Sequence, residues 1–296
     1  MNQPSFNGTG VALITPFKNQ AIDFDALESI IEHTLKGGVN YLVSLGTTGE
    51  AITLSSQECR EVLTFTKDIV KGRVPLVAGL FGSNWTALLK QRVQSYSLEG
   101  YDAIMSSSPA YNKPPQEGIY QHYKAIAKAA KLPIILYNVP GRTGVVMSAA
   151  TTLRLAALDN IIGVKEASAN FDIFNEIAAN KPEGFQLISG DDPITLPMIA
   201  LGASGVISVI GNALPLQTSN MVRTCLEQNF KKAQPMHSML LEFTRLCFVE
   251  GNPAGVKSGL KHLGICEDHL RLPLVPVSDD TKTKIKAQID LILANS

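Results

Sequence analysis

Residues 161–166 read Ile-Ile-Gly-Val-Lys-Glu, an apolar run of the length of one β-strand that reaches a lysine near its end. Side chains alternate sides along a strand, so Ile161, Gly163 and Lys165 are expected on one face and the two residues between them on the other. A run that is apolar on both faces is typical of a parallel sheet covered by helices. The stretch therefore predicts a buried strand whose last inward position holds an amine.

The Lys165 amine would then lie where little water reaches it. Burial disfavours the charged form of lysine and lowers its pKa, and the neutral amine is a nucleophile that can form a Schiff base with a ketone. The alternative is a strand-end lysine that pairs with Glu166 or reaches solvent, which is the commoner arrangement when such a lysine is considered alone. Matching chemistry at the other strand ends is what favours the reactive amine.

The chain repeats a strand, a short loop and a helix, which is the outline of a wound α/β fold. Apolar strand-like runs begin near Val11, Tyr41, Leu76, Tyr101, Ile134, Ile161, Phe185 and Gly205. Apolar residues between them recur three or four apart, as in amphipathic helices. Eight such units in about 220 residues favour a closed (β/α)8 TIM barrel over an open doubly wound sheet, which usually has fewer strands. No GxGxxG or GxxxxGK[ST] motif occurs, so no nucleotide-binding loop is predicted.

The alternation stops after Leu214, and three helical stretches without intervening strands are expected there. They begin at Pro215, at Asn252-Pro253 and near Asp280. No linker rich in proline, glycine or serine separates this part from the rest. We therefore expect a (β/α)8 catalytic barrel over residues 1–228 and a C-terminal helical extension over residues 229–296 that packs on it.

Composition limits the partners and the location. The 296 residues are 45% hydrophobic and 18% charged, with 26 basic and 26 acidic side chains, which gives no reason to expect nucleic acid or an anionic membrane as partner. No apolar run approaches the length of a membrane span, and residues 1–10 lack the features of a signal peptide, so export is not expected. Neither a zinc site nor a disulfide framework is expected, because no CxxC pairing joins Cys59, Cys225, Cys247 and Cys266.

Polar groups gather at the predicted carboxyl ends of the strands, where barrel enzymes hold their chemistry. Hydroxyls and backbone N–H groups in a glycine turn can hold a carboxylate or relay a proton, and guanidinium suits two-point capture of a carboxylate. A phenol needs hydrogen-bonded neighbours to exchange protons near neutral pH. One amine, two phenols, two threonines and a guanidinium are expected on this rim: Lys165, Tyr111, Tyr137, Thr47, Thr48 and Arg142.

Each candidate also has a purely structural explanation. Singly, the tyrosines fit a half-buried strand residue and a loop anchor, the threonines fit turns or caps, and Arg142 fits a solvated surface. Asp191 and Asp192 can suggest a metal, but adjacent aspartates before Pro193 also cap a helix, and we prefer the cap. No metal site is therefore predicted. No histidine is expected to be catalytic, because His33, His122, His237, His262 and His269 all lie on or beside helical segments.

Four segments match the motifs of a known family, in the same order along the chain. They are Gly46-Thr47-Thr48-Gly49-Glu50, Tyr137-Asn138-Val139-Pro140-Gly141-Arg142-Thr143, Gly163-Val164-Lys165-Glu166-Ala167-Ser168 and Gly205-Val206-Ile207-Ser208-Val209. Over nearly the whole chain the sequence resembles the pyruvate-dependent class I aldolase and N-acetylneuraminate lyase family. It is most similar to the 4-hydroxy-tetrahydrodipicolinate synthase (dihydrodipicolinate synthase) branch, a choice that depends mainly on Arg142 and the double threonine.

The resemblance implies a role for each matching residue. Lys165 would form the Schiff base with pyruvate, and Tyr137 would donate and accept protons at that carbon. Thr47 and Tyr111 would complete a proton relay, with Tyr111 reaching in from a neighbouring subunit. The substrate contacts implied are Thr48 and Ile207 to pyruvate, the main chain of Gly190 to the pocket, and Arg142 to the carboxylate of the second substrate.

The resemblance also implies the reaction, which is condensation of pyruvate with L-aspartate 4-semialdehyde in diaminopimelate and lysine biosynthesis, in the cytoplasm. No metal or organic cofactor is required, because the protonated imine is the electron sink. The implied assembly is a homotetramer, as a dimer of dimers, or a homodimer. Two alternatives remain: a retro-aldol lyase acting on N-acetylneuraminate or a 2-keto-3-deoxy sugar acid, and a non-catalytic barrel that binds an oxo-acid as a sensor.

The chain departs from the family pattern at positions linked to feedback inhibition. Ala110 stands where many synthases carry a second tyrosine, and Ser56, Cys59 and Leu88 stand where lysine-inhibited members often carry histidine or glutamate. A charged amino acid is poorly held without polar partners. We therefore predict weak inhibition by lysine or none. Inhibition at low lysine concentration in a steady-state assay would contradict this.

Overall fold

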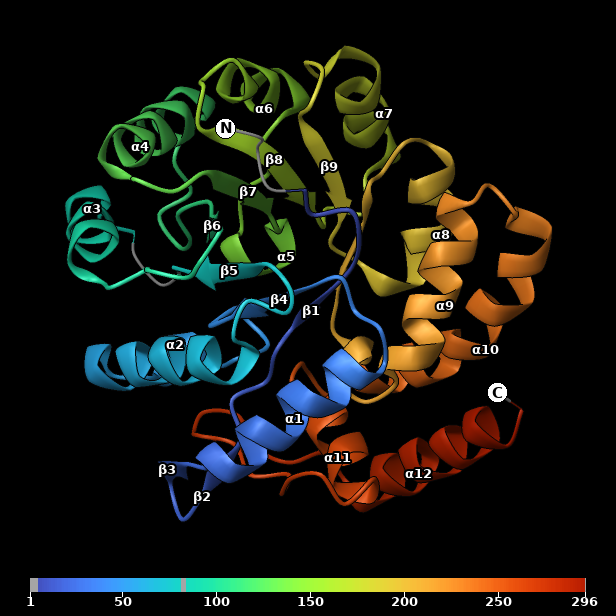
Figure 1. Ribbon diagram of the computed structural model, residues 1–296. Coiled ribbons are helices and arrows are strands. Elements are labelled where there is room, and N and C mark those ends of the chain that lie inside the picture. The colour runs from blue at the N-terminus through green and yellow to red at the C-terminus, as the bar shows by residue number, and fades with distance from the viewer. Residues whose placement is uncertain (1–4, 81–83, 296) are drawn as a thin grey trace.

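The computed structural model describes residues 5–80 and 84–295. Eight parallel strands close into a barrel in the order β1-β10-β9-β8-β7-β6-β5-β4, and helices surround it (Figure 1). The strands are β1 (Gly8–Ala12), β4 (Tyr41–Ser44), β5 (Leu76–Gly79), β6 (Ala103–Ser107), β7 (Ile134–Asn138), β8 (Ile161–Glu166), β9 (Gln186–Ser189) and β10 (Gly205–Ser208). The (β/α)8 barrel predicted from the sequence is confirmed.

The helices of the barrel form where the apolar residues recur at helical spacing. They are α1 (Phe24–Lys36), α2 (Ser56–Val70), α3 (Thr86–Ser95), α4 (Gln116–Ala129), α6 (Ala149–Ala156), α7 (Phe171–Asn180), α8 (Thr195–Ala200) and α9 (Pro215–Leu226). Short turns of helix lie in the loops: α5 (Pro140–Thr143), η1 (Ala51–Thr53), η2 (Asp192–Ile194) and η3 (Ile210–Asn212). A small antiparallel pair that the sequence did not predict, β2 (Phe17–Lys18) and β3 (Ala21–Ile22), follows β1.

One detail of β8 differs from the strict alternation expected of it. Ile162 belongs to the cluster of side chains inside the barrel, whereas Ile161 belongs to the cluster between the strands and the helices. The cause is a register shift between β7 and β8 at Ile134 and Ile135, which acts as a β-bulge. Regular pairing resumes beyond it, so Lys165 still lies opposite Tyr137.

Four helices follow Leu214, one more than predicted. Helices α9, α11 (Ala254–His262) and α12 (Asp279–Ala294) begin within two residues of the expected positions. The sequence did not predict α10 (Phe230–Phe248), which contains Pro235, a residue that removes a backbone donor and usually interrupts a helical pattern. The proposed boundary at 228/229 lies between α9 and α10, and α10 packs against α9, α11 and α12. Within the described ranges, no helix has both the length and the apolar character needed to cross a membrane.

Candidate active site

Lys165 and Tyr137 lie side by side at the carboxyl ends of β8 and β7. They are paired in the register of the two strands, and the Lys165 Nζ is 4.6 Å from the centroid of the Tyr137 ring. Lys165 is only 5% exposed, and Glu166 hydrogen-bonds to Asn138 and to the backbone of Ser168 instead of pairing with it. The structure thus places Lys165 inside the barrel rather than in solvent.

Burial lowers the pKa of Lys165 to about 8. The negative charge of Asp192 opposes this shift, and the positive charge of Arg142 adds to it. An amine with a pKa of about 8 is neutral in roughly one molecule in ten at pH 7, against fewer than about one in a thousand for an ordinary lysine. A nucleophilic amine is therefore available near neutral pH.

Tyr137 is a protonated phenol with a hydroxyl partner. Burial raises its pKa to about 12, and the charge of Arg142 and a hydrogen bond with the Thr47 side chain oppose the rise. The phenol can therefore donate a proton next to the Lys165 amine, and Thr47 gives that proton a path to a second hydroxyl.

Thr47 and Thr48 lie in the loop that follows β4. The loop closes through hydrogen bonds from the backbone N–H of Gly49 to the carbonyl of Gly46 and from Glu50 to Thr47, both 3.1 Å. Thr48 is buried, and its hydroxyl oxygen accepts a hydrogen bond of 3.0 Å from the side-chain amide of Asn252. The loop therefore presents one threonine to Tyr137 and holds the other against the C-terminal extension.

A cavity of about 250 Å³ opens beside this loop. Thr47 and Arg142 line it together with Ser107 and Val139, whereas Lys165 and Tyr137 do not line it. Thr47 connects the cavity to the buried pair, because it also hydrogen-bonds to Tyr137. The exposed Arg142 places a guanidinium on the cavity wall, where it can meet a carboxylate.

The other predicted site residues lie in different surroundings. Ile207 is buried inside the barrel. A Cβ atom added at Gly190 would lie 3.0 Å from the Cε of Lys165, so this glycine leaves room for the lysine side chain. Tyr111 is 91% exposed, with a backbone φ of 70° and its N–H donating to the carbonyl of Thr143. Within one subunit, the Tyr111 side chain is therefore directed to solvent.

The prediction that Asp191 and Asp192 cap the helical turn that begins at their own position is wrong. Neither carboxylate caps the turn η2 that begins there; Asp192 instead accepts hydrogen bonds from the backbone N–H groups of Val209 (2.8 Å) and Ile210 (3.3 Å), at the start of η3. Burial raises the pKa of Asp192, and these hydrogen bonds oppose the rise. Across the described residues, no group of three or more His, Cys, Asp or Glu is arranged to hold a metal ion.

The contributions of two groups near the site were not predicted from the sequence, which named Asp192 only as a helix cap or a metal ligand. Asp192 carries the charge that acts on Lys165, and the signal for it was present, since it follows a strand end on the same rim. Asn252 contacts Thr48 across a separation of 204 residues. Its Asn-Pro pair indicated only a helix start, and no local pattern shows such a contact.

Comparison with known proteins assigns nearly the whole chain to one protein family. Residues 5–292 match the model of the Dihydrodipicolinate synthetase family. The chain is 51% identical, over 95% of each protein, to a Parabacteroides distasonis protein named 4-hydroxy-tetrahydrodipicolinate synthase. The pyruvate complex of the chloride-inhibited dihydrodipicolinate synthase of Acinetobacter baumannii matches with a TM-score of 0.94 at 35% identity, over 97% of this chain and 99% of that one. A monomeric variant of dihydrodipicolinate synthase also matches, with a TM-score of 0.94 at 36% identity and 97% coverage of both chains.

We predict that Asp192→Asn lowers the pKa of Lys165 below its value of about 8. The amide keeps an acceptor for the backbone of Val209 but loses the negative charge that favours the ammonium form. The measurement is the pH dependence of carbamylation of Lys165 by cyanate, located by mass spectrometry. Asp191→Asn is the matched control and should shift the pKa less, because Asp191 exerts the smaller effect. An unchanged or raised pKa in Asp192→Asn would contradict the prediction.

Proposed function

The chain belongs to the dihydrodipicolinate synthetase family, and on that premise we propose that it condenses pyruvate with L-aspartate 4-semialdehyde to give 4-hydroxy-tetrahydrodipicolinate. The reaction serves diaminopimelate and lysine biosynthesis, and we infer that it takes place in the cytoplasm. The observation that carries the proposal is the buried Lys165 amine beside the Tyr137 phenol. A barrel that only bound an oxo-acid would not need a lysine with a lowered pKa there.

The first step is formation of an imine at Lys165. The lone pair of the neutral amine attacks the ketone carbon of pyruvate, and the carbonyl oxygen takes the proton that the attacking nitrogen releases, which gives a carbinolamine. Tyr137 then protonates the resulting hydroxyl, water leaves, and a protonated C=N bond remains. Burial keeps the Tyr137 phenol protonated for this step, since it raises the pKa to about 12.

The second step makes the new carbon–carbon bond. The Tyr137 phenolate left by the first step removes a methyl proton, and the electron pair of that C–H bond moves toward the iminium nitrogen to give an enamine. The terminal carbon of the enamine then adds to the aldehyde carbon of the second substrate, which restores the C=N bond. The aldehyde oxygen takes a proton from Tyr137. The amino group of that substrate finally displaces Lys165 by transimination, which closes the six-membered ring and frees the enzyme. The hydrogen bond between Thr47 and Tyr137 supports a relay role for both residues.

Substrate binding is assigned to the residues around this pair. Thr48, Ile207 and the main chain of Gly190 are proposed to contact pyruvate, and Arg142 to bind the carboxylate of the semialdehyde. The position of Arg142 on the cavity wall supports the condensation over the retro-aldol alternative, because a neutral polyol chain has no use for a guanidinium there. No cofactor is invoked, since the iminium group itself accepts the electron pair.

The test of the function is a coupled assay with pyruvate and L-aspartate 4-semialdehyde, run beside cleavage of N-acetylneuraminate. We expect condensation, and a permanent adduct on Lys165 when pyruvate and borohydride are added together. Lys165→Arg is the matched control, because it keeps the positive charge but cannot form the imine, and it should lose both signals. Cleavage of the sugar acid without condensation would support the lyase, and reversible pyruvate binding without an adduct would support the sensor.

We further propose that the protein is a homotetramer, as a dimer of dimers, or a homodimer, and that Tyr111 acts in the site of a neighbouring subunit. The exposure of 91% for Tyr111 and of 80% for Ile52, which lines the cavity, supports a partner surface beside the site. One of the similar proteins is a monomeric variant, so the assembly of this chain has to be measured.

Mixing two inactive variants tests the role of Tyr111. In a mixed assembly, the Tyr111→Phe subunit keeps Lys165. Its site then receives Tyr111 from the neighbouring Lys165→Ala subunit. We therefore expect activity to return after the two proteins are unfolded and refolded together, with each variant refolded alone as the control. Failure to recover activity, with mixed assemblies shown by native mass spectrometry, would place Tyr111 in its own subunit's site or outside both.

A further inference from the structure

The loop that carries Thr47 and Thr48 adopts an uncommon backbone conformation. Leu45 and Glu50, at its two ends, have φ values of 59° and 51°, in the left-handed region that residues other than glycine rarely occupy. The strand β4 ends at Ser44, so its ladder does not hold the loop. Such a conformation persists only when its surroundings determine it.

Glu50 connects one end of this loop to the C-terminal extension through an ion pair and a hydrogen bond. Its Oε1 lies 2.5 Å from the Nζ of Lys257 in helix α11, and both side chains are fully buried. Its Oε2 accepts a hydrogen bond of 3.2 Å from the backbone N–H of Arg271. The Nζ of Lys257 also donates to the carbonyl of His269 at 2.8 Å. The carboxylate and the ammonium thus satisfy each other where no water reaches them.

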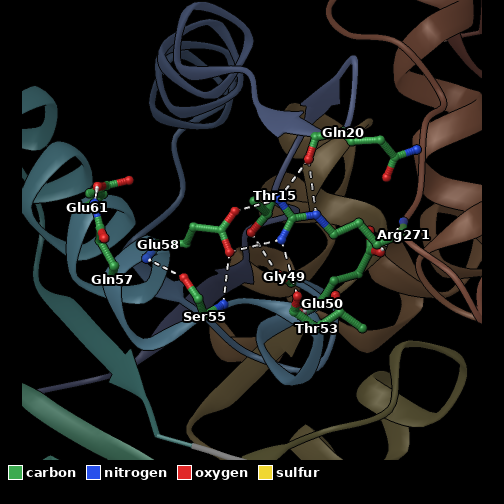
Figure 2. A network of polar contacts seen from close by, with 10 residues as sticks. All are labelled: Thr15, Gln20, Gly49, Glu50, Thr53, Ser55, Gln57, Glu58, Glu61 and Arg271. Carbon is green, nitrogen blue, oxygen red and sulfur yellow. Dashed lines mark hydrogen bonds and ion pairs between the residues drawn. The ribbon is translucent and has the colours of Figure 1, made fainter.

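Arg271 makes a second connection just beyond the loop (Figure 2). Its guanidinium pairs with Glu58 at 2.5 Å and donates to the carbonyls of Thr53 (3.1 Å) and Gln20 (2.7 Å). Glu58 in turn accepts from the backbone N–H of Ser55 in the capping box of α2. One arginine of the extension therefore holds both the turn η1 and the start of α2.

Asn252 makes a third connection, on the loop itself. Its side-chain amide donates to the Thr48 hydroxyl at 3.0 Å, and its backbone carbonyl accepts from the Arg142 guanidinium at 3.5 Å. With one lone pair of the Thr48 oxygen engaged, its hydroxyl proton is free to be donated elsewhere. All three connections come from the same part of the chain, residues 252–271, and reach the loop or the segment that follows it.

We propose that Lys257, acting through Glu50, is a positioning residue for catalysis, so that the C-terminal extension is a working part of the active site. The inference rests on the proposed role of Thr47 in proton transfer. A buried ion pair is often no more stabilising than an apolar pair of similar volume, but its geometry is specific. Removing it should let the loop move and separate Thr47 from Tyr137. Lys165 lies on β8 and should still form the imine.

The informative variant is the double substitution Glu50→Gln with Lys257→Met, which removes both charges together. The single variant Lys257→Met would leave the Glu50 carboxylate buried and unpaired, and it can fail to fold for that reason. Two readouts are compared with wild type. One is the final yield of borohydride-trapped pyruvate adduct, and the other is the exchange of the pyruvate methyl protons with deuterium, followed by NMR. We expect an adduct yield within about twofold of wild type and an exchange rate and kcat at least about tenfold lower, with a smaller change in the KM for pyruvate.

Two control variants separate positioning from general damage. Lys261→Met removes a lysine of the same helix that pairs with Glu267 and Asp268, both outside the loop, and it should exchange at the wild-type rate. Ile289→Ala empties a buried site in α12 and should lower the melting temperature without changing exchange.

The results separate this inference from the proposed function. Wild-type exchange in a folded double variant would overturn the positioning role, and so would a parallel loss of adduct and exchange, which indicates a disrupted site. Slow exchange in Ile289→Ala would overturn it as well, because destabilisation alone would then explain the effect. If the wild-type protein formed no adduct and exchanged no protons, the proposed function itself would fail.

Discussion

The desolvation of one amine is the constraint on which the site depends. Lys165 is buried among the side chains of the barrel rim, and its pKa of about 8 corresponds to a net cost of roughly 3 kcal/mol for its charged form. Water would remove that cost, so the closed barrel and the covering helices are part of the chemistry. Gly190 leaves the space that the side chain needs, and the pairing of β7 with β8 puts the Tyr137 phenol beside it.

Burial lowers the pKa of both Lys165 and Lys257, but the two lysines have different polar partners. Lys257 has a carboxylate at 2.5 Å and a backbone carbonyl at 2.8 Å, so its ammonium form is satisfied despite burial. Among the described residues, none forms an ion pair with Lys165, and Asp192, whose charge acts on it, is engaged with backbone N–H groups. Both lysines are buried, and what differs is the carboxylate that hydrogen-bonds directly to Lys257, which suits a structural role, whereas the Lys165 amine is left available as a nucleophile.

The sequence was informative wherever the determining interaction is local. Helices and strands follow from the spacing of apolar residues, and the burial of Lys165 follows from a run that is apolar on both faces. Helix α10 was not predicted, because Pro235 interrupts its pattern of apolar residues. The shift of Ile162 into the barrel interior was not predicted either, because a bulge depends on the partner strand. The contacts of Asn252 and Lys257 join residues more than 200 positions apart, and no periodicity reports such pairs. The proposed role of Tyr111 came only from resemblance, since its side chain is exposed to solvent in the single chain.

These long-range contacts explain how a short strand can support an accurate site. β4 has four residues and ends at Ser44, so Thr47 lies three residues beyond the last position that the strand ladder can fix. A hydroxyl that shares a proton with Tyr137 must be held to within a fraction of an ångström, because hydrogen-bond strength falls steeply with distance and angle. Local hydrogen bonds close the turn but do not orient it relative to β7. That orientation comes from contacts outside the loop: the Thr15 hydroxyl, after β1, donates to the carbonyl of Gly49 at 2.7 Å, and Asn252 and Lys257 contact Thr48 and Glu50 from the extension.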